Sequence, residues 1–222
     1  MKTIAVANSA GGVGKTTLAH CLAVSFAEFG KKTLLIDLDP SGALTFRLGF
    51  ENPRISVVDF FNGLKANDSN IETTSERFDF IPADSRLTSL SPVDALSNLI
   101  SNLPKDYDLV LLDLPASFSQ PFALALTVSD LLLVPVRNTV HSLRGYLQVK
   151  SVTGKVPVLA IAIGPNTFIS SADLLDEEII ESSEIEMAAT AKVSILTSAK
   201  SGDVAESYRS AGYSILEKLG LE

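Results

Sequence analysis

Residues 3–26 read TIAVA-NSAGGVGKTT-LAHCLAVSF, and this stretch decides the fold. The apolar run Thr3–Ala7 is typical of a buried strand, and residues 18–26 have the apolar pattern of a helix. A glycine-rich turn that joins a strand to a helix and ends in Gly-Lys-Thr forms a cradle for phosphate groups. Its glycines let backbone N–H groups turn towards an anion, and the helix N-terminus adds the positive end of its dipole. The stretch therefore predicts an α/β protein with a phosphate-binding loop.

The residues of this loop have separate predicted roles. Lys15 is long enough to reach the outer phosphates of a nucleotide, and the Thr16 hydroxyl is placed to coordinate Mg²⁺. The alternative, a tight glycine turn with a surface lysine, leaves the flanking strand and helix unexplained. The other predicted phosphate-binding residues are Gly11, Gly12, Val13, Gly14 and Thr17.

Acidic residues follow two further apolar runs. Asp37 and Asp39 come at and just after the end of one predicted strand, and Asp113 ends another. In an open α/β sheet the ligand lies beyond the carboxyl ends of the strands. We therefore expect Asp39 to hold metal-bound water or to orient an attacking water, and Asp113 to bind Mg²⁺ through water.

Apolar runs and helical patterns alternate along the chain, which is typical of a parallel sheet with crossover helices. The sequence predicts one domain, residues 1–222, built as a doubly wound, mostly parallel sheet with helices on both faces. The predicted strands are Thr3–Ala7, Thr33–Asp37, Phe78–Pro82, Leu109–Asp113, Leu131–Pro135, Val158–Ile163 and Val193–Leu196. The predicted helices are Lys15–Phe29, Pro92–Asn102, Phe118–Thr127, Ser142–Lys150, Asp173–Glu186 and Val204–Leu219, and residues 62–77 are predicted to be a loop.

Composition narrows the class of protein. Apolar residues make up 46% of the chain, which excludes a disordered protein, and Cys21 is the only cysteine, which excludes a disulfide framework. No apolar stretch reaches the ~18 residues of a membrane-spanning helix, so we expect a cytoplasmic protein without a membrane anchor. The net charge is −8, and residues 173–186 carry seven carboxylates. That run fits either a solvated helix face or a docking face for a basic partner.

The loop and the acidic motifs resemble those of the ParA/MinD ATPases, which have a deviant Walker A loop. The double glycine before Val13-Gly14-Lys15-Thr16 matches that loop, and Asp37-x-Asp39-Pro40 resembles the family's Asp-x-Asp-Pro-Gln, with serine in place of glutamine. The resemblance extends from residue 2 to about residue 163. It implies a P-loop NTPase fold, ATP and Mg²⁺ as ligands, and slow ATP hydrolysis in which Asp39 positions the water.

The resemblance also implies partners. Family members form a homodimer with ATP sandwiched between the subunits, bind DNA non-specifically, associate with the nucleoid, and respond to an adaptor that stimulates hydrolysis, here of the ParB/McdB type. The family's DNA contacts lie in the C-terminal third, where Lys192, Lys200 and Arg209 are the candidates. By analogy, Asn166 is a candidate for the adenine edge, although an asparagine beside proline is also a common turn residue.

One position departs from the family. Where the signature lysine of the loop would touch the partner's nucleotide, this chain has Ala10. The McdA branch, which positions carboxysomes, resembles this chain in lacking that lysine, and there an equivalent lysine comes from the second half of the chain. Lys150 is the candidate for this catalytic role here. Plasmid or chromosome partition is the alternative function, and an ATP-dependent metabolic ligase of the same fold is a third.

Overall fold

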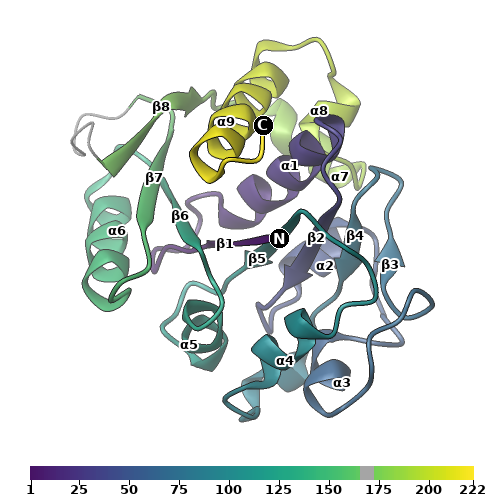
Figure 1. Ribbon diagram of the computed structural model, residues 1–222. Coiled ribbons are helices and arrows are strands. Elements are labelled where there is room, and N and C mark those ends of the chain that lie inside the picture. Colours follow the sequence, from purple (N-terminus) through teal and green to yellow (C-terminus); the bar gives the residue numbers. More distant parts are fainter. Residues whose placement is uncertain (166–172) are drawn as a thin grey trace.

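The computed structural model describes residues 1–165 and 173–222. Within that part of the chain, a central sheet has helices packed on both faces (Figure 1). The eight strands lie in the order β3-β4-β2-β5-β1-β6-β7-β8, and every neighbouring pair except β3–β4 is parallel. The strands are β1 (Lys2–Val6), β2 (Thr33–Asp37), β3 (Glu72–Thr73), β4 (Asp79–Ile81), β5 (Leu109–Asp113), β6 (Leu131–Val136), β7 (Val158–Ile163) and β8 (Leu174–Ile179). The predicted fold class is therefore confirmed.

The helices form the two outer layers. The described helices are α1 (Lys15–Glu28), α2 (Ala43–Arg47), α3 (Val57–Phe61), a 3-10 turn η1 (Ser85–Thr88), α4 (Ala95–Ser101), α5 (Gln120–Leu126), α6 (Val140–Val152), α7 (Glu184–Thr190), α8 (Ile195–Ser198) and α9 (Asp203–Leu219). Helices α1 and α9 lie side by side over one face of the sheet (Figure 1). Side chains of α3, α4, α5 and α6 share a core with the other face.

The strands feed both cores because successive side chains of a strand point to opposite faces. In β5, Leu109 and Leu111 pack in the core that contains α1 and α9, whereas Val110 and Leu112 pack in the core that contains α3 to α6. The central strands are thus buried on both sides, which explains their nearly continuous apolar runs. The ends of these strands all meet at one edge of the sheet, where the polar motifs follow.

Two predicted elements are wrong. Residues 173–186, predicted as a helix, form the edge strand β8 followed by a turn and α7. Leu175 and Ile179 are both buried in the core that contains α1, and their spacing of four residues fits one face of a strand as well as of a helix. Residues 193–196, predicted as a strand, begin α8 instead, with Ser194 accepting a hydrogen bond from the Thr197 N–H as its N-cap.

The remaining predicted strands and helices agree with the structure to within about three residues at each end. The predicted loop, residues 62–77, contains the two-residue strand β3, and the short helices α2 and α3 were not predicted. In the described part of the chain, none of the helices is long and apolar enough to cross a membrane.

Candidate phosphate-binding site

The phosphate loop lies between buried strand β1 and the N-terminus of α1. Gly12 and Gly14 have φ angles of 71° and 96°, a left-handed conformation that glycine adopts without strain. Gly14 is the N-cap of α1, and no side chain caps the helix. The N–H groups of the first turn of α1 are therefore available to an anion.

A cavity of about 770 Å³ opens beside this loop. Most of the predicted loop residues line it, together with Asp39, which follows the end of β2. Its lining consists of Gly11, Gly12, Gly14, Lys15, Thr16, Thr17, Asp39, Ala116, Arg137, Ile163, Glu181, Ser182, Ser183, Ile185, Glu186 and Tyr208. Val13 is buried and is absent from the lining, whereas Asn166 falls outside the described residues.

Lys15 lies inside the site. The residue is 8% exposed, and Nζ donates a hydrogen bond to the carbonyl of Ala10 at 3.1 Å. Burial lowers the pKa of Lys15, and the negative charges of Asp113 and Asp39 oppose that shift. The ammonium group is thus bonded to the loop and lies in the electrostatic field of two carboxylates.

Asp37 and Asp113 are register partners at the ends of β2 and β5. Asp37 accepts hydrogen bonds from the N–H of Asp39 and from the N–H and hydroxyl of Thr45, at 2.9, 2.9 and 2.7 Å. Burial nevertheless raises its pKa to about 6. Because three groups donate hydrogen bonds to its carboxylate, Asp37 fixes both the loop that carries Asp39 and the start of α2.

Asp113 differs from Asp37 because it has no such support. It is fully buried, and among the described residues neither of its carboxylate oxygens has a hydrogen-bond partner. Burial and the charge of Asp37 raise its pKa well above the usual range, while Thr16 and Lys15 oppose the rise. A buried carboxylate without partners is costly unless a cation or hydrated cation is bound nearby. The residues present thus fit Mg²⁺ held through water.

The predicted Mg²⁺ set has two further members. Thr16 and Asp39 both line the cavity, and the Asp39 carboxylate accepts a hydrogen bond from the Ser41 N–H at 2.8 Å. The described residues contain no cluster of three acidic, histidine or cysteine side chains that would cage a metal unaided. Mg²⁺ is usually held by one or two carboxylates together with substrate phosphates and water.

The first half of the loop is seated on α6. The Asn8 side chain donates to the carbonyls of Pro135 and Ser142, at 2.9 and 3.4 Å, and accepts from the Ala10 N–H at 2.8 Å. Ala10 is only 1% exposed. A Cβ placed on Gly145 of α6 would lie 3.1 Å from the Ala10 Cβ, so the two backbones approach closely here. The position of the family's signature lysine is therefore occupied by a small, buried side chain.

Behind the loop lies a buried polar chain that sequence reasoning missed. The guanidinium of Arg47 donates to the Thr17 hydroxyl and to His20 Nδ1, both at 3.2 Å. His20 Nε2 pairs with Glu76 at 2.6 Å, and Glu76 also accepts from the Ser194 N–H and hydroxyl. Because Nδ1 accepts from Arg47, the ring proton resides on Nε2. Burial lowers the pKa of His20, and the hydrogen bond and charge of Glu76 oppose that shift.

A second missed feature is an ion pair across the cavity, between Arg137 after β6 and Glu181 after β8. Both residues line the cavity. The available signal was that Arg137 directly follows an apolar run, at the edge where ligands bind. Glu181 carried no such signal, since it was assigned to a helix.

Lys150 lies outside the cavity. It sits ten residues beyond the start of α6, exposed, with Nζ 2.6 Å from Asp173. At 1.5 Å per residue this places Lys150 roughly 15 Å along the helix from the strand ends. Lys150 does not line the cavity of its own subunit, although the Ser9 hydroxyl of the loop donates to Gln148 on the same helix, and its role on a partner's nucleotide stays a prediction.

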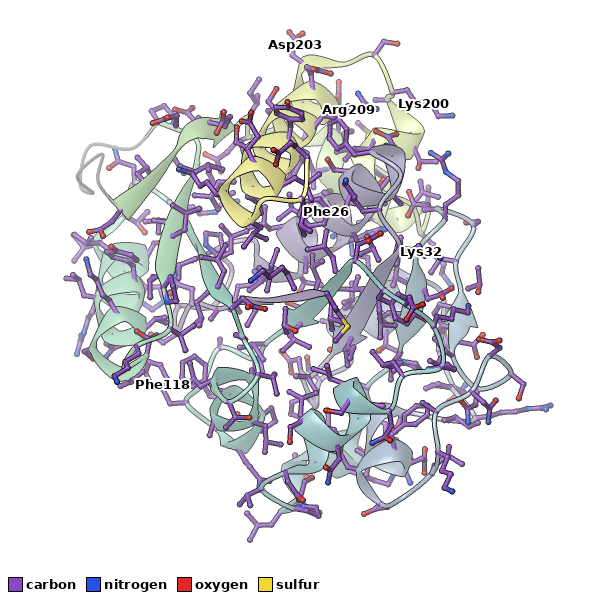
Figure 2. The ribbon with its side chains drawn as sticks, viewed as in Figure 1. Phe26, Lys32, Phe118, Lys200, Asp203 and Arg209 are labelled. Atoms are coloured by element: carbon purple, nitrogen blue, oxygen red, sulfur yellow. The ribbon has the colours of Figure 1, made fainter. Side chains whose placement is uncertain are left out.

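The predicted DNA contacts have acidic neighbours. Lys192 pairs with Glu51 at 2.7 Å, and Arg209 pairs with Glu28 at 2.7 Å while donating to the Lys200 carbonyl. Figure 2 shows Lys200 and Arg209 at one end of the molecule, with Asp203 close by. Lys200 is exposed.

Comparisons with known proteins agree with this geometry. A family model described as "AAA domain" matches residues 1–158. The sporulation initiation inhibitor protein Soj of Bacillus subtilis is 32% identical over 160 residues, which cover 66% of this chain and 62% of Soj. The chromosome partitioning protein ParA of Caulobacter vibrioides is 32% identical over 163 residues, which cover 67% of this chain and 60% of ParA. The chain thus spans about three fifths of the length of these curated relatives.

Solved structures share the fold over almost the whole chain. A plasmid partition protein of Borrelia burgdorferi bound to AMPPNP has a TM-score of 0.83 at 20% identity, covering 98% of this chain and 99% of that one. Apo McdA of Cyanthece has a TM-score of 0.78 at 20% identity, covering 97% of this chain and 99% of that one. A cobyrinic acid a,c-diamide synthase of Mycobacterium smegmatis with an ATP analogue and magnesium has a TM-score of 0.77 at 24% identity, covering 99% of this chain and 95% of that one. The motif-bearing loop, the strand-end acids and the match over residues 1–158 together make this chain a member of the AAA_31 family of AAA domains, of the ParA/MinD type.

Proposed function

We propose that this chain is an Mg²⁺-dependent ATPase switch of the ParA type, which dimerises around ATP, binds DNA non-specifically and positions or segregates a cargo. The observation that carries the proposal is the juxtaposition at one edge of the sheet. The phosphate loop with Lys15, the partnerless carboxylate of Asp113 and the cavity-lining Asp39 meet there. The chromosome partitioning protein ParA of Caulobacter vibrioides, at 32% identity, supports this choice.

Nucleotide binding follows from the loop. The backbone N–H groups from Gly11 to Thr17 would surround the phosphates, and Lys15 would leave the Ala10 carbonyl to pair with them. The Thr16 hydroxyl and, through water, Asp113 would hold Mg²⁺, which supplies charge neutralisation between the outer phosphates. The chain's own part in this step is to present fixed dipoles in a partly buried site, where they need no reorganisation.

Hydrolysis needs a group that orients water. Asp39 is suited to this role because its backbone and side chain are fixed, by the Asp37 carboxylate and the Ser41 N–H, while it faces the cavity. Its position also explains why Asp37 is buried: Asp37 anchors the turn and Asp39 faces the ligand. Slow turnover that an adaptor stimulates fits a site in which a catalytic cation is missing from the loop itself.

The dimer and cargo belong to the same proposal. The proposal includes a ParB/McdB-like adaptor, association with the nucleoid in the ATP-bound state, and carboxysomes as the cargo. Plasmid or chromosome partition is the alternative function. Lys150 could serve a partner's nucleotide only if its pair with Asp173 opened. Lys192, Lys200 and Arg209 would likewise exchange carboxylate or carbonyl partners for DNA phosphates.

A second candidate is an ATP-dependent ligase that activates a carboxylic acid. The diamide synthase, at 24% identity, shares the fold of this chain, so the fold is compatible with such an enzyme. The two candidates differ in their second ligand, which is DNA for the switch and a small acid for the ligase.

Nucleotide titration and sedimentation with Mg²⁺ and ATP test the proposal. We expect wild-type protein and the exposed-lysine control Lys155→Ala to bind ATP and dimerise, whereas Lys15→Ala loses both. Asp39→Ala should bind ATP, hydrolyse it poorly and remain a dimer. Binding of random-sequence DNA should require ATP and weaken steeply with salt, because phosphate contacts release counterions. Turnover that requires a small carboxylic acid and ignores DNA would establish the ligase instead.

A further inference from the structure

A second basic side chain reaches the cavity from the end of β6. Arg137 directly follows Val136, the last residue of that strand, and its backbone N–H donates to the Ser142 hydroxyl at 2.9 Å. The neighbouring carbonyls of Pro135 and Ser142 accept from Asn8 in the phosphate loop. The turn that carries Arg137 is therefore fastened to the loop itself, which fixes the root of the arginine relative to the phosphates.

The sheet register places Arg137 level with the departure from the family motif. Val6 of β1 pairs with Leu133 of β6, and Ala10 and Arg137 each lie four residues further along. On the other side, Val136 pairs with Ala162 of β7. Arg137 thus leaves the sheet beside the very segment in which the family's lysine is replaced by alanine.

The guanidinium of Arg137 has capacity for a further partner. One terminal nitrogen, Nη1, pairs with Glu181, while Nε is buried and has no hydrogen-bond partner among the described residues. The side chain is 36% exposed. A guanidinium offers five N–H donors in a planar fork that matches phosphate oxygens.

Glu181 holds the arginine from the opposite wall. One oxygen of its carboxylate pairs with Arg137, and the other lies 2.7 Å from the point where a Cβ on Gly164 would be. The absence of a side chain at Gly164, the first residue after β7, leaves room for this carboxylate. The pair therefore spans the cavity from the end of β6 to the turn after β8.

The charges of the site make this pair exchangeable. Among the described residues lining the cavity, Lys15 and Arg137 are basic, whereas Asp39, Glu181 and Glu186 are acidic. A triphosphate adds more negative charge to a site that is already acidic. Ala10, at the position of the family's signature lysine, provides no positive charge to balance it. The phosphates of a bound nucleotide would compete with Glu181 for the guanidinium of Arg137, and they would repel the Glu181 carboxylate.

We propose that Arg137 is the second phosphate-binding cation of this site, acting within its own subunit on the outer phosphates, and that Glu181 holds it until a nucleotide displaces the carboxylate. This inference rests on the proposed nucleotide binding. It assigns to Arg137 the charge that the loop lacks at Ala10, and it makes the turn after β8 sensitive to whether a nucleotide is bound.

Calorimetric titration with AMPPNP, ADP and AMP in the presence of Mg²⁺ tests the assignment. Arg137→Ala should weaken AMPPNP binding by about 10- to 100-fold, the range of a charge-assisted hydrogen bond, and AMP binding far less. Arg137→Lys should recover part of the loss. Arg54→Ala, an exposed arginine outside the cavity, is the matched control and should bind as wild type does.

Glu181→Gln provides an independent readout because it removes the competitor without removing a phosphate ligand. It should tighten AMPPNP binding severalfold, and this gain should vanish in the Arg137→Ala background. Equal losses for all three nucleotides in Arg137→Ala would place the arginine on the base or ribose and overturn the proposal. So would an Arg137→Ala variant that binds AMPPNP normally while Lys15→Ala does not. Failure of the wild type to bind any of the nucleotides would instead refute the proposed function.

Discussion

Gly145→Ala should damage the phosphate loop although residue 145 lies in the middle of α6. A Cβ at this position would lie 2.0 Å from Asn8 Oδ1, 2.9 Å from the Ala10 nitrogen and 3.1 Å from the Ala10 Cβ. Asn8 cannot simply rotate away, because its amide nitrogen is bonded to the Pro135 carbonyl and its Oδ1 accepts from the Ala10 N–H. The loop or the helix must therefore move.

The expected loss of stability comes from opposing contributions. Alanine in place of glycine inside a helix stabilises by about 0.5–1 kcal/mol. Overpacking at a backbone contact costs about 1–3 kcal/mol, and a lost Asn8–Ala10 hydrogen bond adds about 1 kcal/mol. The net effect should be a destabilisation of about 1–3 kcal/mol, and each kcal/mol lowers the melting temperature of a domain of this size by about 2–4 °C.

Thermal unfolding and nucleotide titration, made on the same variants, separate a local effect from a general one. Gly212→Ala is the matched control, because a Cβ there would lie 2.3 Å from Ser25 Oγ in the α1–α9 contact, away from the loop. Both variants should melt below wild type, but only Gly145→Ala should lose nucleotide affinity, by about tenfold. If Gly145→Ala melts and binds as wild type does, the loop does not depend on its seat against α6.

Two further predictions concern buried charges. Because the pKa of Asp113 is raised above 3.8, the unfolded chain releases this proton at lower pH than the folded chain, so wild type loses stability as pH rises from about 4 towards neutrality. Asp113→Asn should remove that loss: in urea unfolding without nucleotide or Mg²⁺, its advantage over wild type should be largest near pH 7 and shrink towards about pH 4, and a pH-independent difference would contradict the assignment. Glu76→Ala should destabilise by about 3 kcal/mol or more at neutral pH, since it leaves His20, Ser194 and Thr197 around an empty carboxylate position, and urea unfolding within about 0.5 kcal/mol of wild type would show that the polar chain contributes little.

The central part of the site was predictable because its signals are local in sequence. The loop Gly11–Thr17 follows a strand and opens a helix, and the acids Asp39 and Asp113 end or follow apolar runs. In a parallel sheet, residues that follow different strands meet at one edge, so short motifs far apart in sequence can be combined without knowledge of the packing. The structure brings Lys15, Thr16 and Asp39 to one cavity as this rule predicts.

The features that the sequence did not predict depend on tertiary packing, which the spacing of residue types along the chain does not determine. The spacing of basic residues did not indicate that Lys150 pairs with Asp173 and does not line the cavity of its own subunit. The acidic run also failed as a helix, because an edge strand with two buried apolar residues four apart has the same pattern. Carboxylates on such an edge suit a strand that must not pair further.

The order in which the chain is synthesised gives the α1–α9 contact another meaning. The phosphate loop and α1 are synthesised well before Leu175, Ile195, Tyr208 and Ile215, with which α1 shares its core. Glu76 likewise waits for Ser194, 118 residues later. The ligand-binding motif therefore emerges from the ribosome before α9, the helix that packs against α1 behind it.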